Sequence, residues 1–228
     1  MPRSRSANPG RTPRASPRRV RSGMSGALMA EDDGLVRCPW GLDPPEYRLY
    51  HDQEWGRPVG DDDRIFEKLC LEGFQSGLSW LTILRKREGF RRAFAGFDPE
   101  VVATFGEGDV ERLLSDPSIV RHRAKIQAAI GNARATVRLR EQGLSLAAVV
   151  WRHEPAERPS PVDSGSLPAT TAESKALSSE LRRLGFGFVG PTTVYASMHS
   201  LGVVNDHVAD CVFRPVVESE RARFTRPV

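Results

Sequence analysis

The sequence contains no long hydrophobic run. No apolar stretch approaches the roughly 20 residues that a membrane-spanning helix needs, and the N-terminus lacks the apolar core of a signal peptide. We therefore expect a soluble, cytoplasmic protein without a membrane partner. The composition, with 39% hydrophobic and 27% charged residues, is that of a globular protein. The 228 residues suffice for one well-buried domain and are short for two.

Cysteine is scarce and odd in number. The three residues, Cys38, Cys70 and Cys211, cannot all pair with one another, and the chain has no export signal that would take it to an oxidising compartment. A disulfide framework is therefore not expected. A metal site and buried thiols are the alternatives.

Acidic residues are absent from residues 1–22, which contain seven arginines. The rest of the chain has 26 basic and 29 acidic side chains, so its net charge is about −3, although the whole chain carries +4. The basic character thus belongs to the N-terminal segment. Any nucleic-acid surface on the folded part must be a local patch.

The composition changes near residue 33. Residues 1–33 are rich in Arg, Ser, Pro, Gly and Ala and have almost nothing to bury, so we expect a disordered basic tail. Such a tail can raise non-specific affinity for DNA through phosphate contacts. Alternatively, it is a dispensable extension upstream of a start at Met24 or Met29. We expect a folded domain over residues 34–215 and a flexible C-terminal tail over 216–228.

Strand-like alternation is nearly absent, and apolar residues recur at helical intervals. Asp61-Asp62-Asp63 predicts the start of a helix that runs through Cys70, and Asp98-Pro99 predicts the start of a short one. Further helices are predicted over about 79–94, 119–141, 145–152 and 171–184, with a surface loop over 154–169. The predicted fold class is all-α.

Four residues have the chemistry of a closed metal site. Cys38 and His51 lie near the start of the domain, and His207 and Cys211 lie four residues apart near its end. On a helix, residues i and i+4 project from one face, so His207 and Cys211 would hold one ion together. Two thiolates and two imidazoles form a tetrahedral zinc set without a position for water, which favours a structural ion. The alternative is four unrelated residues.

A glutamate lies in an apolar, glycine-containing run. Because glutamate is rarely buried without a partner, Glu72 is either a pocket carboxylate that binds a ligand or a helix-end residue exposed to water. Tyr47, Tyr50, Trp55 and Trp80 form an aromatic group near it in the sequence. Such side chains can bind flat rings, including extruded bases, although core packing is their commoner role.

A glycine-rich segment separates two predicted helices. Residues 183–193 contain Gly185, Gly187 and Gly190, followed by Pro and Thr, which suits a tight turn that ends at a helix N-terminus. Because exposed amides there bind anions, we interpret the segment as a helix-hairpin-helix that holds a DNA phosphate. A plain loop has a similar composition. The basic run 121–125 adds a local patch or simply a solvated helix face.

Taken together, these segments resemble the 3-methyladenine DNA glycosylase I family of the helix-hairpin-helix glycosylase superfamily. The similarity covers about residues 37–212, with many blocks in the same order and spacing. The matching blocks are Arg37-Cys38-Pro39-Trp40, Tyr50-His51-Asp52-Gln53-Glu54-Trp55-Gly56, Leu71-Glu72-Gly73, Gly77-Leu78-Ser79-Trp80, Arg121-His122-Arg123-Ala124-Lys125-Ile126, Gly131-Asn132-Ala133-Arg134-Ala135, Phe188-Val189-Gly190 and Val204-Asn205-Asp206-His207-Val208.

The resemblance implies a role for each group of candidate residues. It implies one structural zinc ion per chain that joins the two ends of the domain, with the ligands Cys38, His51, His207 and Cys211. It makes Glu72 the base-recognition carboxylate and the catalytic residue. The other base-binding residues are then Tyr47, Tyr50, Trp80 and Asn205, and the residues of the hairpin that bind DNA phosphate are Gly187, Gly190 and Thr192.

Some positions depart from related sequences. The wider superfamily typically carries a catalytic Asp just after the hairpin, but here Asn205 takes that position and cannot ionise. The hairpin also contains no lysine that could form a Schiff base, so a monofunctional glycosylase is expected. Phe74 and Ser76 stand where small or amide residues are frequent in the family, which would alter the pocket wall.

The implied reaction is hydrolysis of the N-glycosidic bond of 3-methyladenine, and of 3-methylguanine, in alkylated double-stranded DNA during base excision repair. We expect a monomer in the bacterial cytoplasm, associated with the nucleoid through DNA. Another hairpin glycosylase for a neutral alkylated or oxidised base is one alternative, and a DNA-binding scaffold without catalysis is a second. A catalytic zinc hydrolase is disfavoured because four protein ligands leave no open position.

Overall fold

The computed structural model describes residues 21–22, 28–29, 33–156 and 167–228. Most of the predicted disordered tail and much of the predicted loop over 154–169 therefore lie outside the described residues. None of the helices in the described ranges is long and apolar enough to cross a bilayer.

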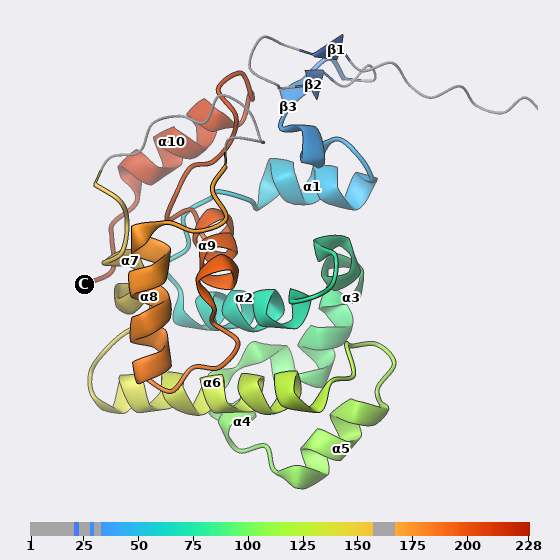
Figure 1. Ribbon diagram of the computed structural model, residues 1–228, viewed down its shortest axis with the longest axis vertical. Helices are drawn as coiled ribbons and strands as arrows, with labels where there is room; N and C mark the ends of the chain where they lie inside the picture. Colours follow the sequence, from blue (N-terminus) through green and yellow to red (C-terminus); the bar gives the residue numbers. More distant parts are fainter. Residues whose placement is uncertain (1–20, 23–27, 30–32, 157–166) are drawn as a thin grey trace, which may run out of the picture.

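The described chain is almost entirely helical, so the all-α prediction is confirmed (Figure 1). Three two-residue strands, β1 (Arg21–Ser22), β2 (Leu28–Met29) and β3 (Val36–Arg37), pair antiparallel in that order. Two short 3-10 helices are η1 (Pro39–Gly41) and η2 (Ala95–Phe97). The α-helices are α1 (Pro45–Gln53), α2 (Asp62–Gln75), α3 (Trp80–Ala93), α4 (Pro99–Ala103), α5 (Glu107–Ser115), α6 (Arg123–Glu141), α7 (Leu146–Trp151), α8 (Ala172–Arg183), α9 (Pro191–Ser200) and α10 (Arg214–Arg223).

Two of the predicted helix starts have a polar side chain that caps the helix N-terminus. The Asp61 carboxylate accepts a hydrogen bond from the Arg64 amide and begins α2. The Asp98 side chain accepts from the amides of the first turn of α4, which has proline at its first position. Such caps satisfy amides that have no partner within the helix. The helix predicted over 119–141 begins later, at Arg123, because His122 is its cap.

Helix α2 lies at the centre of the molecule and packs against α3, α6, α7 and α9 (Figure 1). Its apolar residues Ile65, Phe66, Leu69 and Leu71 are buried in the main core. Phe74, near its C-terminal end, packs against Phe90 and Phe94 of the α3 region, with ring centroids 4.6 and 5.8 Å away. The last turns of α2 are therefore held in place by the core.

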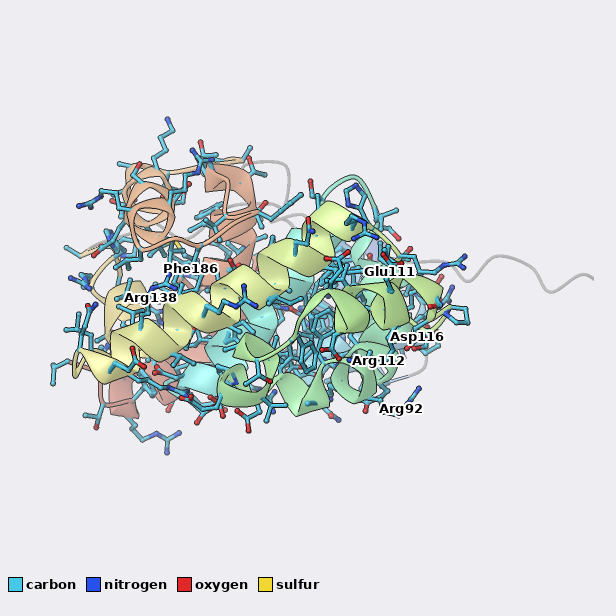
Figure 2. All side chains as sticks on the ribbon, turned by 90° about the horizontal axis from the view of Figure 1, so that it is seen from below. Arg92, Glu111, Arg112, Asp116, Arg138 and Phe186 are labelled. Carbon is cyan, nitrogen blue, oxygen red and sulfur yellow. The ribbon has the colours of Figure 1, made fainter. Side chains whose placement is uncertain are left out.

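A tight turn over residues 184–190 joins α8 to α9. Gly185 ends α8 with φ +95°, a conformation that favours glycine. Helix α6 runs past this turn, and Figure 2 shows Arg138 of α6 beside Phe186. The Arg138 guanidinium donates to the Leu184 carbonyl at 3.4 Å. Two helices joined by a tight turn are therefore present where the sequence predicted them, and α6 contacts the turn.

The C-terminal segment 216–228 differs from the predicted flexible tail. Residues up to Arg223 form α10, and Val217 is buried. Beyond the helix, the Phe224 ring packs on Trp151 with centroids 4.6 Å apart, and the Arg226 guanidinium binds the Glu154 carboxylate. The prediction was wrong because this segment is anchored by a few apolar residues and by three ion pairs, Arg57–Glu220, Arg221–Glu154 and Arg226–Glu154. Neither feature gives a helical hydrophobic pattern in the sequence.

Candidate functional site

A cleft of about 390 Å³ lies between α1, α2, α3 and α9. Its volume falls in the range of small-molecule pockets, about 300–1,000 Å³. Four residues predicted for base binding line it together: Tyr47 and Tyr50 from α1, Glu72 from α2 and Trp80 at the start of α3. The other lining residues are Trp40, Trp55, Gln75, Leu167, Pro168, Ala169, Thr192, Tyr195, Ala196 and His199.

The aromatic side chains are fixed by contacts with one another and with backbone. The rings of Tyr50 and Trp80 are tilted by 49° with centroids 5.5 Å apart. The Tyr47 hydroxyl accepts a hydrogen bond from the Leu81 amide at 3.0 Å, which joins α1 to the first turn of α3. The Trp40 ring meets Tyr47 edge-on at 5.9 Å. The cleft therefore presents a preformed aromatic wall.

Glu72 is a buried carboxylate within this wall and is only 5% exposed. Burial raises its pKa, and the ammonium group of Lys68, one helical turn earlier, opposes that rise. The Lys68 Nζ lies 3.4 Å from Glu72 Oε1. The interpretation of Glu72 as a pocket carboxylate is thus supported by its position, and the alternative of a helix-end residue exposed to water is wrong.

A polar network between α9 and Asp206 was not predicted from the sequence. His199 lines the cleft, and its Nε2 lies 2.9 Å from Asp206 Oδ2. The Tyr195 hydroxyl donates to the same oxygen at 3.1 Å, and Asp206 is fully buried. The spacing of Tyr195 and His199, four residues apart on a predicted helix, was the available signal. Asp206 therefore orients His199 at the edge of the cleft.

Asn205 lies outside this cleft, contrary to the prediction that it binds the base. Its amide nitrogen donates to the Arg214 carbonyl at 3.1 Å and to the Glu218 carboxylate at 2.8 Å, and it lines a separate cavity beside α10. Its neighbour Asp206 points toward α9 instead. The local backbone conformation decides whether Asn205 or Asp206 faces the cleft. The sequence pattern does not predict that conformation.

Replacement of Asn205 by alanine should leave base binding intact. The substitution removes hydrogen bonds to α10, at a cost of about 1 kcal/mol in the free energy of unfolding. We expect a slightly lower melting temperature and a rate of 3-methyladenine release from methylated DNA close to that of the wild type. A large fall in the rate of base release without a fall in stability would indicate that Asn205 does take part in base binding.

The hairpin offers only part of the predicted phosphate site. The Gly187 amide donates to the Asn132 side-chain oxygen at 2.7 Å, and the Gly187 carbonyl accepts from the same side chain at 3.2 Å. The Gly187 amide therefore already has a partner within the protein, and its predicted phosphate contact stays a prediction. Gly190 caps α9, and Thr192 lies in the first turn of that helix and lines the cleft, so both stay candidates.

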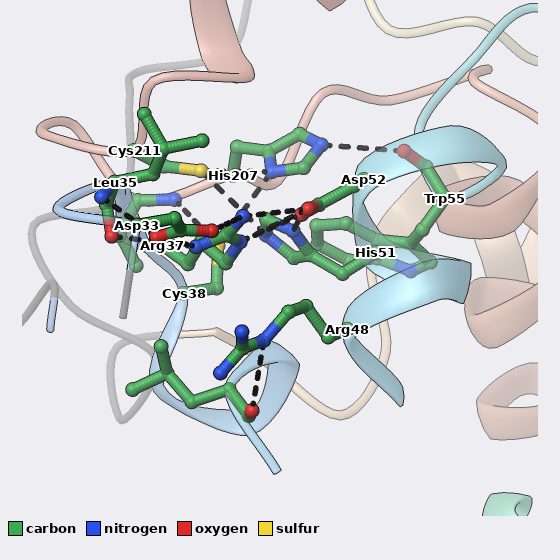
Figure 3. Close-up of polar contacts among 12 residues, drawn as sticks. Asp33, Leu35, Arg37, Cys38, Arg48, His51, Asp52, Trp55, His207 and Cys211 are labelled. Atoms are coloured by element: carbon green, nitrogen blue, oxygen red, sulfur yellow. Dashed lines mark hydrogen bonds and ion pairs between the residues drawn. The ribbon is translucent and has the colours of Figure 1, made fainter. Parts of the chain in front are cut away.

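The four predicted metal ligands converge. Cys38, His51, His207 and Cys211 are all buried, and one potential ligand atom of each lies within 4.8 Å of the others (Figure 3). The Cys211 Sγ lies 3.3 Å from His207 Nδ1 and 3.6 Å from His51 Nε2, and Cys38 Sγ lies 3.6 Å from His207 Nδ1. Tetrahedral zinc with ordinary bond lengths puts sulfur and nitrogen ligands about 3.5 Å apart. The geometry therefore fits a four-coordinate zinc ion.

The second nitrogen of each histidine is held by the protein. His51 Nδ1 lies 2.8 Å from Asp52 Oδ1, and His207 Nε2 lies 3.2 Å from the Trp55 carbonyl (Figure 3). Such partners fix the ring orientation and the tautomer of metal-bound histidine. Asp52 is held in turn by the buried Arg37 guanidinium, with contacts of 2.8 to 3.1 Å. Each imidazole is thus left with one nitrogen directed at the cluster.

The environment of Cys211 favours its thiolate, whereas the hydrogen bond to Cys211 and burial raise the pKa of the Cys38 thiol. A hydrogen bond from the Cys38 thiol, together with the neighbouring imidazoles, lowers the pKa of Cys211 well below its usual range. Thiolate is the form that binds zinc. The prediction that His207 and Cys211 share a helix face is wrong, because residues 205–211 form an irregular turn in which the Cys211 amide donates to the Val208 carbonyl.

The fold and the sequence match known proteins. Among solved structures, one of a 3-methyladenine DNA glycosylase I has a TM-score of 0.75 and 45% identity, covering 77% of this chain and 98% of that one. A variant of 3-methyladenine DNA glycosylase I in complex with 3-methyladenine has a TM-score of 0.74 and 32% identity, covering 78% and 97%. These similarities define the class, a helical DNA glycosylase fold.

The sequence comparisons agree. DNA-3-methyladenine glycosylase 1 of Escherichia coli (strain K12) is 47% identical over 184 residues, which cover 79% of this chain and 98% of that protein. The model of the methyladenine glycosylase family matches residues 40–215. The chain belongs to the methyladenine glycosylase family, and the predicted resemblance is confirmed.

Proposed function

We propose that this chain hydrolyses the N-glycosidic bond of 3-methyladenine, and of 3-methylguanine, in alkylated double-stranded DNA. The observation that carries the proposal is the cleft, in which a buried carboxylate lies among fixed aromatic rings. Enzymes that act on a base extrude it from the duplex into such a pocket. The solved relative that holds 3-methyladenine supports the same class of ligand.

The residues of the cleft would contribute to recognition of the base in two different ways, by hydrogen bonding and by stacking. The Glu72 carboxylate would accept hydrogen bonds from the exocyclic amine and the ring edge of the base. Tyr50 and Trp80 would stack on the ring, each such contact contributing about 1–3 kcal/mol. A hydrogen bond to a charged group adds about 1.5–3 kcal/mol. These energies suffice to select a base but are small for breaking a stable bond.

The lesion itself supplies much of the reactivity. 3-Methyladenine in DNA carries a positive charge, so the electron pair of the C1′–N bond passes readily to the leaving base. Water then adds at C1′ and loses a proton to solvent, which leaves an abasic sugar and a free base. We therefore expect excision of labile cationic lesions and little excision of neutral ones such as hypoxanthine.

Zinc is the ion that the metal cluster fits best. Cys38, His51, His207 and Cys211 would hold it with all four positions filled, so it would supply a cross-link within the fold and no chemistry at the base. The sites of DNA contact include the start of α9 at Gly190 and Thr192, where helix amides can bind a phosphate.

A monofunctional glycosylase is part of the proposal. Lyase activity needs an amine that attacks C1′, and the described residues that line the cleft include no lysine. Lys68 is near Glu72 but lines a second cavity instead. The expected products are free base and an intact strand with an abasic site.

The proposal is tested by chromatography of bases released from methylated duplex DNA. We expect 3-methyladenine as the main product and 3-methylguanine as a second one, with no strand cleavage on a labelled duplex. Release of hypoxanthine or ethenoadenine at comparable rates would favour the alternative of a glycosylase for neutral lesions. Absence of any released base would favour a DNA-binding scaffold.

The same assay in excess EDTA separates a structural from a catalytic metal. Because the proposed zinc ion has four protein ligands, full activity is expected while the fold holds the ion. Immediate loss of activity without unfolding would indicate a metal-activated water and overturn this assignment.

A further inference from the structure

The basic run 121–125 contains a buried cation, Lys125, which the proposed function does not use. Lys125 lies in the first turn of α6 and is 8% exposed, so it is not part of a solvated basic face. A positive charge in the first turn of a helix is disfavoured by the helix dipole. Burial lowers the pKa of its ammonium group, and no carboxylate among the described residues opposes that change. The stability of α6 therefore does not explain why a lysine occupies this position.

The partners of Lys125 lie at the end of another helix. Its Nζ donates hydrogen bonds to the Phe74 carbonyl at 2.9 Å and to the Ser76 carbonyl. Phe74 belongs to the last turn of α2, and Ser76 is the C-terminal cap of that helix. Carbonyls at a helix C-terminus lack partners within the helix and are stabilised by a cation. Lys125 thus fixes the point at which α2 passes into its connection with α3.

This connection is a type II turn over residues 75–78. Ser76 has φ −45° and ψ 117°, and Gly77 has φ +81°. The Leu78 amide donates to the Gln75 carbonyl at 2.6 Å and closes the turn. In the alternative type I turn, the central peptide is rotated by roughly 180°. Because glycine adopts either sign of φ, Gly77 alone does not commit the turn to one type.

The contact with Lys125 distinguishes the two orientations of the central peptide. Lys125 holds the Ser76 carbonyl, which would point away from α6 in a type I turn. The C=O and N–H groups of a trans peptide point in opposite directions, so the Gly77 amide is directed away from Lys125. Residues 76–79 are exposed, and the space beside Gly77 is open. The Gly77 amide therefore lies on the outer side of the turn.

The turn forms part of the rim of the cleft. Gln75 at its start and Trp80 just after it both line the cleft. A base that is bound there stays attached to its strand until the glycosidic bond breaks, so the adjoining sugar and phosphates lie at the rim. Backbone amides are common partners of DNA phosphates. The orientation of the turn thus decides which groups the rim presents to the DNA.

We propose that Lys125 is a positioning residue that holds the 75–78 turn in its type II form, so that the rim of the cleft is preset to receive DNA. This inference rests on the proposed function, and it concerns binding of the duplex, not recognition of the base. Without Lys125 the turn populates both orientations, and the apparent affinity for DNA falls with the fraction that remains competent.

The test measures single-turnover release of 3-methyladenine from methylated duplex DNA over a range of enzyme concentrations. For Lys125→Met, which cannot bind carbonyls, we expect the half-saturating enzyme concentration to rise about tenfold. The maximal rate should stay close to that of the wild type. So should the dissociation constant of free 3-methyladenine, measured by quenching of tryptophan fluorescence. Lys125→Arg keeps hydrogen-bond donors at this position and should recover most of the loss.

Arg134→Met is the matched control. Arg134 also lies on α6 and donates to two backbone carbonyls, those of Ala103 at 3.0 Å and Phe105 at 2.8 Å. Neither of these partners lines the cleft. We expect this variant to lose stability and to keep the half-saturating concentration of the wild type. Equal behaviour of Lys125→Met and Arg134→Met would make Lys125 merely structural and overturn the inference alone.

Gly77→Ala reaches the turn without touching Lys125. A Cβ at Gly77 meets no other atom within 4 Å, so the substitution acts on the backbone by disfavouring the positive φ of the type II turn. We expect the half-saturating concentration to rise as in Lys125→Met, and no further rise in the double variant, because both changes act on one peptide. If Lys125→Met does not fold, Gly77→Ala decides in its place, and an unchanged half-saturating concentration overturns the inference.

Two further outcomes separate this inference from the proposed function. Loss of free-base binding in Lys125→Met or Gly77→Ala overturns the inference, because the effect then lies in the cleft and not in the turn. Failure of the wild type to release any base overturns the proposed function and this inference with it.

Discussion

Glu72→Gln should lower the rate of 3-methyladenine release by roughly 5- to 13-fold, the loss of about 1–1.5 kcal/mol expected when a hydrogen bond to a charged group is replaced by a neutral one. Glutamine keeps the shape of the side chain and one acceptor oxygen, but it removes the negative charge. It also leaves Lys68 without its ion partner at 3.4 Å. The measurement is chromatography of bases released from methylated DNA under single-turnover conditions.

Glu67→Gln is the matched control. Glu67 lies on the same helix with similar burial, but its carboxylate binds Arg91 at 2.7 Å and faces away from the cleft. We expect this variant to lose some stability and to keep most of its activity. Equal loss of activity in the two variants would show that the effect comes from charge on α2 in general. An unchanged Glu72→Gln variant would remove Glu72 from the mechanism.

Cys211→Ser should abolish stoichiometric metal binding and lower the melting temperature by on the order of 10 °C or more. A structural zinc ion of this kind contributes about 10–16 kcal/mol in small zinc domains, and each kcal/mol shifts the melting temperature of a chain of this size by about 2–4 °C. The substitution removes the sulfur that lies nearest to both histidines. Zinc content by mass spectrometry and thermal melting are the two measurements.

Cys70→Ser provides the comparison for this experiment. Cys70 is also buried, but it lies in the main core and outside the metal cluster. We expect one zinc ion per chain in this variant and only the modest destabilisation of a buried polar exchange, about 1–3 kcal/mol. Retention of zinc by Cys211→Ser, or its loss in Cys70→Ser, would refute the assigned ligand set.

The helices were predictable because their signals are local. Asp61 and Asp98 cap the helices that they precede, and the apolar residues of α2 recur at helical spacing and reach the core. The C-terminal helix was not predictable in the same way. Its attachment depends on the Phe224–Trp151 contact and on Glu154, which are distant in the sequence.

The sequence predicted which residues come together in the site. It did not predict several of the contacts that these residues make. The aromatic residues and Glu72 do meet in one cleft, and the four metal ligands do converge. The Gly187 amide is occupied by Asn132, a residue 55 positions away. Lys68 could be placed one turn from Glu72 by spacing alone, but its contact with Tyr50 required the packing of α1 against α2 and α3.

The position of the metal cluster has a consequence for the cleft. Trp40, Tyr47 and Tyr50 all belong to the short segment bounded by the ligands Cys38 and His51. The two ends of this segment, which contains η1 and most of α1, lie at the metal cluster, so a bound ion would limit how far its aromatic side chains can shift. An ion held by these four ligands would in this way affect the shape of the pocket, and its gradual removal should broaden the range of bases accepted before the protein unfolds.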